Sequence, residues 1–186
     1  MKLQAIKRIA RFAIFGAIGF SVGGILGLLI SDALWQPGDF FYHSYLIAPP
    51  GTGLLGGAML GAALRQRSKV IALALLGAIG FSGGVIIAFG SAILFSYPSA
   101  EALSMGIVIV MGAIGGGTIG IGLMRLRPVL GLALAGALGG LVGGAIFAPI
   151  ITLQWSDIIL PGIIGGALLG AALGFLEKGE KEPVIE

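Results

Sequence analysis

The stretch from Phe12 to Ile30 has nineteen consecutive residues without a charge, and Gly19, Gly23 and Gly27 recur within it at intervals of four. Nineteen apolar residues in a helix are long enough to cross the hydrocarbon core of a bilayer. Glycines spaced by four lie on one side of a helix, where they let a neighbouring backbone approach closely. A chain with this segment is expected to fold in a membrane from closely packed helices.

The composition agrees with a membrane protein. Hydrophobic residues make up 57% of the chain and charged residues 10%, and the mean hydropathy is +1.08. The 35 glycines lie mostly inside apolar runs and follow no Gly-X-Y period, which excludes collagen and a flexible linker. Because the chain has no cysteine, disulfides and thiolate sites are excluded as well.

The N-terminal segment 1–11 carries four basic residues among apolar ones, as in an amphipathic helix that suits an anionic lipid leaflet. A secretory signal peptide is the alternative interpretation, with 31–33 as a cleavage-like sequence. Two features oppose that alternative: the apolar run exceeds a normal signal core, and it is the first copy of an internal repeat. We therefore interpret 12–30 as a transmembrane helix.

Five more apolar runs predict five more spans, at about 50–64, 70–94, 102–124, 129–148 and 158–176, and the charged tail 177–186 is expected to be disordered. Two signatures alternate along these runs. One begins at Gly16, Gly77 and Gly136, which are 61 and 59 residues apart, and the other begins at Gly53, Gly112 and Gly162.

This alternation predicts an all-α integral membrane protein of six transmembrane helices, built as one domain, 1–186, from three tandem glycine-zipper hairpins. The hairpins cover about 12–64, 70–124 and 128–176. Hairpins of one orientation imply a pseudo-threefold axis along the membrane normal. The alternative is that glycine-rich helices merely resemble one another. The glycines expected to pack the helices are Gly19, Gly23, Gly57, Gly61, Gly80, Gly84, Gly116, Gly120, Gly139, Gly143, Gly166 and Gly170.

Lysine and arginine fix the expected orientation. All eleven lie in the N-terminal segment, the turns 65–69 and 125–127, or the C-terminal tail. The other three connections contain no lysine or arginine but do contain Asp32, Asp39, Glu101 and Asp157. The positive-inside rule then places both termini in the cytoplasm. We expect a multi-pass protein of a prokaryotic plasma membrane. Its expected partners are the lipid bilayer and either a second copy of itself or other membrane proteins.

The spans contain no ionisable side chain, which argues against a proton relay. The single histidine offers no metal or catalytic constellation, and no phosphate-binding loop is present. We therefore expect no enzyme activity, no catalytic residue, no cofactor, no metal and no nucleic-acid partner. The hydroxyl groups in the spans, such as Ser21 and Ser82, are expected to bond their own helices; the alternative is a ring of hydroxyls around a path, which Leu141 in the third repeat weakens.

The second and sixth spans begin at Pro50 and Pro161 and are short, about 22 Å for the former at 1.5 Å per residue. Either the segments before these prolines are helical or interfacial, or they enter the membrane as irregular backbone around a cavity. In the second case the outer cavity would be lined by Trp35, Asp39, Tyr42, His43, Tyr45, Trp155 and Asp157.

Three hairpins of one orientation are similar in architecture to mitochondrial carriers, but the Pro-x-[Asp/Glu]-x-x-[Lys/Arg] signature of that family is absent, so the match is rejected. Six helices in fewer than 200 residues also resemble the substrate-binding subunits of energy-coupling vitamin transporters, in size and helix count alone. Two functions follow as hypotheses: a small permease, channel or transporter subunit with an outward-facing cavity, or a membrane scaffold that packs through its glycine-rich faces.

Overall fold

The computed structural model describes residues 2–34, 40–94, 100–123, 126–147 and 156–177. These residues form six α-helices and no strand, which confirms an all-helical fold for the described part of the chain. The helices are α1 (Lys2–Leu34), α2 (Phe40–Ala63), α3 (Arg67–Leu94), α4 (Ala100–Ile121), α5 (Leu126–Phe147) and α6 (Ser156–Leu176).

Two helices begin earlier than the prolines suggested. α2 continues through Pro49 and Pro50, and α6 through Pro161. The prediction that α2 begins at Pro50 is therefore wrong, and the helical alternative for the segments before both prolines is correct. Proline removes one helical hydrogen bond, but its fixed φ is compatible with a helix, so the helix persists where its surroundings support it.

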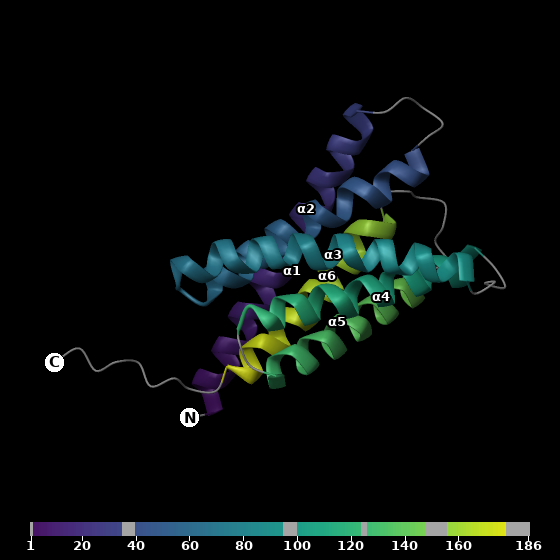
Figure 1. Ribbon diagram of the computed structural model, residues 1–186. Helices are drawn as coiled ribbons and strands as arrows, with labels where there is room; N and C mark the ends of the chain where they lie inside the picture. Colours follow the sequence, from purple (N-terminus) through teal and green to yellow (C-terminus); the bar gives the residue numbers. More distant parts are fainter. Residues whose placement is uncertain (1, 35–39, 95–99, 124–125, 148–155, 178–186) are drawn as a thin grey trace.

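The six helices form a closed ring in sequence order. Each helix packs against the next along the chain, and α6 returns to pack against α1. Figure 1 shows the result as an up-and-down arrangement in which the purple start of α1 lies beside the yellow end of α6. A hydrogen bond from Arg8 Nε to Gly174 O, 2.9 Å long, joins these two helices near that end.

Close contacts at glycines recur with the spacing of the repeats. Within the hairpins, a Cβ on Gly23, Gly84 or Gly143 would lie 2.7–2.8 Å from the Cα of the residue at one equivalent position: Thr52, Met111 and Pro161. Between hairpins, the Gly53–Gly77 contact of α2 with α3 has its counterpart in Gly112–Gly136 of α4 with α5.

The contact of α6 with α1 departs from this pattern by one helical turn. Gly162 is the counterpart of Gly53 and Gly112, and Gly16 is the counterpart of Gly77 and Gly136. Gly162, however, faces Phe20, whereas Gly166 faces Gly16. Since residues four apart lie on one helix face, α6 keeps the same packing face and is displaced along α1 by one turn.

The twelve glycines expected to pack the helices all face another helix. At each of them a Cβ would lie closer than 3.0 Å to an atom of a neighbouring helix, so no side chain fits without movement. Gly83 and Gly90 on α3 are different, because a Cβ there would meet nothing within 4 Å.

Aliphatic side chains cover the outside of the ring. Exposed residues follow one another at intervals of four along the odd helices, as in Ile14, Ile18 and Val22 of α1 or Leu130, Leu134 and Leu138 of α5. In the described residues, two helical segments, Leu3–Leu34 and Arg67–Ser91, are long and apolar enough to cross a membrane, and three shorter helical segments are apolar.

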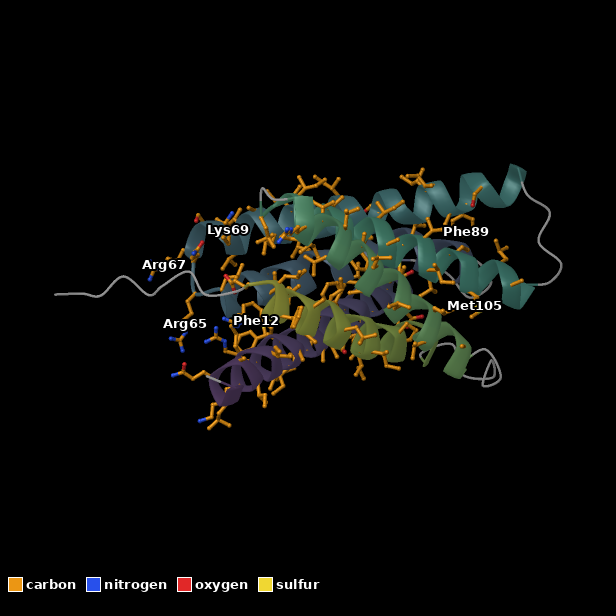
Figure 2. All side chains as sticks on the ribbon, turned by 90° about the horizontal axis from the view of Figure 1, so that it is seen from below. Phe12, Arg65, Arg67, Lys69, Phe89 and Met105 are labelled. Carbon is orange, nitrogen blue, oxygen red and sulfur yellow. The ribbon has the colours of Figure 1, made fainter. Side chains whose placement is uncertain are left out.

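One end of the ring is basic, and we call it the basic end. Figure 2 shows Arg65, Arg67 and Lys69 at the same end as Phe12, with Phe89 and Met105 toward the opposite end. Arg65 terminates α2 in the left-handed region at φ 59°, a common way for a helix to stop. The Nζ of Lys69 donates a 2.9 Å hydrogen bond to Gly122 O just after α4, which ties α3 to the end of α4.

Candidate functional site

The residues predicted to line an outer cavity are only partly described. Trp35, Asp39 and Trp155 lie outside the described residues. Tyr42, His43 and Tyr45 belong to the first turns of α2, and Asp157 to the first turn of α6, but the side chains of these four also lie outside the described part. A role for these residues stays a prediction.

A cavity of about 50 Å³ lies on the axis of the ring, where all six helices contribute to its wall. The even helices supply most of the lining, from positions near the middle of each helix. The lining residues are Phe20, Ala48, Pro49, Thr52, Phe81, Val108, Met111, Gly112, Gly136, Gly140, Pro161, Gly162, Gly165, Gly166 and Leu169.

The floor of this cavity is closed toward the basic end by layers of apolar side chains from equivalent repeat positions. Leu60, Ile119 and Leu169 form one layer and are 0–1% exposed. The second layer, also in the same buried cluster, consists of Phe12, Leu73 and Leu132, each 0% exposed. The ring axis is therefore filled on the basic side of the cavity.

Two aromatic rings in tilted contact form part of the cavity wall. Phe20 and Phe81 occupy equivalent positions in α1 and α3, and their ring centroids lie 5.2 Å apart at an interplanar angle of 44°. The counterpart in α5 is Gly140. The third repeat thus contributes no aromatic side chain to this layer, and the cavity lies where the layer is incomplete.

Gly165 shows the consequence most directly. In the first two hairpins the equivalent glycines are covered by the aromatic rings, because a Cβ on Gly56 would lie 2.6 Å from Phe20 and one on Gly115 would clash with Phe81. A Cβ on Gly165 would meet nothing closer than 3.9 Å. The space in front of Gly165 is the space that a third aromatic ring would fill.

Three hydroxyl groups in the described part of the helices bond within their own helix and not to one another. Ser21 donates to Ala17 O and Ser82 donates to Ala78 O, each within its own helix. Thr118 donates to Gly115 O in the same manner. The own-helix interpretation is confirmed for these three residues, and such bonds satisfy a hydroxyl in an apolar environment without a partner helix.

The cavity is apolar. Thr52 supplies the single polar side chain among its described lining residues, and the Thr52 hydroxyl donates a 2.8 Å hydrogen bond to Ala48 O. The described lining has no ionisable side chain, and the described residues contain no group of three potential metal ligands. The arrangement can therefore bind by shape and apolar contact, not by charge.

That these residues line a cavity was not predicted from the sequence, although the sequence contains a signal for it. The first two odd signatures read Gly-Ala-Ile-Gly-Phe, whereas the third reads Gly-Ala-Leu-Gly-Gly and ends at Gly140. Lining up the three signatures exposes the missing aromatic residue. No protein-family model, curated protein or solved structure matches this chain.

Proposed function

We propose that this protein is a multi-pass membrane protein in which six spans form three glycine-zipper hairpins around a pseudo-threefold axis. The support is the recurrence of glycine contacts at repeat spacing and the rows of exposed aliphatic residues on the odd helices. A protein dissolved in water rarely exposes so much contiguous apolar surface. Two helical segments are long and apolar enough to cross a membrane, and three of the other helices contain shorter apolar segments.

The proposed orientation places the basic end in the cytoplasm. The start of α1, the turn after α2 and the turn after α4 carry the basic residues and belong to one end of the ring. Cytoplasmic connections are enriched in lysine and arginine. The plasma membrane of a prokaryote is the proposed location, and no enzymatic activity is part of the proposal.

Within this frame the protein acts as a small permease or as the binding subunit of a transporter, with a cavity that faces outward. The observation that carries this function is the axial cavity lined by all six helices. A permanently open channel is disfavoured, because the layers that contain Leu60 and Leu73 fill the axis below the cavity. Passage would need these layers to rearrange, as in alternating access.

Accessibility of single cysteines tests this function, since the chain has none of its own. A small membrane-impermeant thiol reagent is applied to each side of membranes that contain Gly165→Cys, Leu60→Cys or the matched control Gly83→Cys. We expect Gly165→Cys to react from the side opposite the basic end, and faster than Gly83→Cys, which faces outward from α3. Leu60→Cys is expected to be protected.

Two outcomes would contradict the proposal. Protection of Gly165→Cys from both sides would show that the cavity is sealed and would remove the basis for a permease. Fast reaction of both Gly165→Cys and Leu60→Cys would show a continuous aqueous path, which is the property of an open channel.

A scaffold is the second candidate function. The observation that favours it is the open space in front of Gly83 and Gly90. Most glycine faces are used inside the ring, so they are not free for partner helices. Gly83 and Gly90 have open space and lie on α3 together with exposed Ile86 and Ile87. If α3 packs against another protein or a second copy, Gly83→Leu will abolish cross-linking to that partner; an unchanged cross-linking pattern would remove the scaffold from consideration.

A further inference from the structure

The axial cavity has the chemistry of a hydrocarbon site. Its described lining consists of apolar side chains and glycine backbone apart from the Thr52 hydroxyl, whose hydrogen is already donated to Ala48 O. A charged or strongly polar ligand would lose its hydration there without replacement hydrogen bonds, which is costly. An apolar cavity of this kind accepts apolar guests in preference to charged ones.

The shape of the cavity limits the guest to a slender group. The space lies next to the tilted ring pair of Phe20 and Phe81, in front of Gly140 and Gly165, where the third repeat lacks its aromatic side chain. A group about as large as the missing benzyl side chain fills that space. The closed layer at Leu169 stops it from extending toward the basic end.

The wall can adapt to such a guest. Met111 belongs to the lining, and methionine fills irregular apolar space because its unbranched side chain has several rotatable bonds and a polarisable sulfur. Phe20 and Phe81 offer ring surfaces for aliphatic or aromatic contact. The lining therefore favours an uncharged apolar group over any particular hydrocarbon shape.

We propose that this cavity binds an uncharged hydrocarbon group, the apolar end of a ligand that enters from the end opposite the basic end. The inference rests on the proposed function and names the class of substrate or ligand for the same cavity. The hydrocarbon end belongs either to a membrane lipid or to a free apolar solute, and the two arms of the experiment below distinguish these sources.

The experiment is photolabelling of the full-length protein with two diazirine probes. The first arm uses a phospholipid with a diazirine at the end of its acyl chain, in nanodiscs. The second uses a medium-length alcohol with a terminal diazirine, on delipidated protein in detergent. Mass spectrometry locates the label, which we expect on peptides that contain Thr52, Phe81 or Met111. If the ligand is a membrane lipid, the lipid probe labels these peptides. If the ligand is a free solute, the alcohol probe alone labels them.

Variants at Gly165 make the test specific. Gly165→Leu fills the cavity and is expected to lower labelling of those peptides about tenfold, a loss equal to one decade in affinity. Gly165→Ala, whose Cβ has room, lowers it less and guards against a folding defect of the larger variant. The matched control Gly83→Leu leaves it unchanged. Excess hexanol displaces the alcohol probe, whereas hexanoate does not, because burial of its charge is unfavourable.

Equal labelling in Gly165→Leu and Gly83→Leu, or displacement by hexanoate as strong as by hexanol, would overturn the proposal. Thiol labelling of Gly165→Cys separates this failure from failure of the proposed function. Normal thiol labelling from the outer side without photolabelling rejects the hydrocarbon ligand alone. If photolabelling occurs but Gly165→Cys stays protected from the thiol reagent on both sides, the ligand site is retained and the outward opening is rejected.

Discussion

The glycines differ in what a side chain at the same position would meet. At Gly57 a Cβ would collide with the backbone carbonyl of Leu73 in α3, whereas at Gly83 it would meet open space. Backbone cannot move aside as the end of a flexible side chain can. Glycine is therefore required at positions such as Gly57 for the distance between helices, and at Gly83 it has no such role.

The substitutions Gly57→Ala and Gly83→Ala form a matched pair that tests this distinction. Gly57→Ala is expected to lower the free energy of unfolding by about 1–3 kcal/mol, the usual cost of overpacking. Gly83→Ala is expected to be neutral or stabilising by up to about 1 kcal/mol, because alanine is the better helix former. Thermal unfolding of both variants in detergent is the measurement, and equal melting temperatures would contradict the account.

For individual residues, the sequence predicts the packing glycines but not the cavity. The twelve packing glycines follow from their spacing, since residues four apart share a helix face. The cavity does not follow from any one residue. It depends on the absence of an aromatic side chain at Gly140, and an absence becomes visible only when equivalent positions in the three repeats are compared.

At the scale of elements, the helices agree with the apolar runs in number and approximate position but differ at their starts. The proline at Pro50 indicated a helix start, because proline is common in the first turn of a helix. α2 nevertheless begins at Phe40. Proline excludes one backbone hydrogen bond without excluding helical dihedral angles, so the sequence alone does not decide between a start and an interior position.

The ends of the helices at the basic end are tied by cations, and Lys69 allows a test. Its ammonium group donates to Gly122 O at the end of α4, where the helix dipole favours positive charge. Lys69→Met keeps most of the side-chain volume and is expected to lower the free energy of unfolding by about 0.5–1.5 kcal/mol.

Arg67→Met is the control for this prediction, because Arg67 is exposed and lies in the first turn of the same helix. It is expected to change stability by no more than a few tenths of a kcal/mol. Chemical denaturation of the two variants in detergent is the measurement. A loss for Arg67→Met as large as for Lys69→Met would show that general positive charge, not the bond to Gly122, stabilises this end.

At the scale of the whole molecule, the ring is the property from which the cavity follows, because the cavity wall needs all six helices. The six helices could be predicted from the six apolar runs. Closure between α6 and α1 could not, since the contact between the last helix and the first is displaced by one turn from its counterparts at Gly53 and Gly112. That displacement depends on how the ring closes and not on local sequence.

The most direct test of the ring is a disulfide between α1 and α6 in native membranes. A Cβ on Gly174 would lie 2.9 Å from the Cα of Ile9, so the two backbones are in contact at this point. A small outward shift of α6 would bring the Cβ atoms of two cysteines to the separation of a disulfide, about 3.5–4.5 Å. In the double variant Ile9→Cys/Gly174→Cys, mild oxidation is expected to give an intramolecular cross-link and a mobility shift that reducing agent reverses. The control Ile9→Cys/Val129→Cys, which joins α1 to α5, is expected to stay uncross-linked. Equal cross-linking of the two pairs, or cross-links only between separate molecules, would contradict a ring closed by α1 and α6.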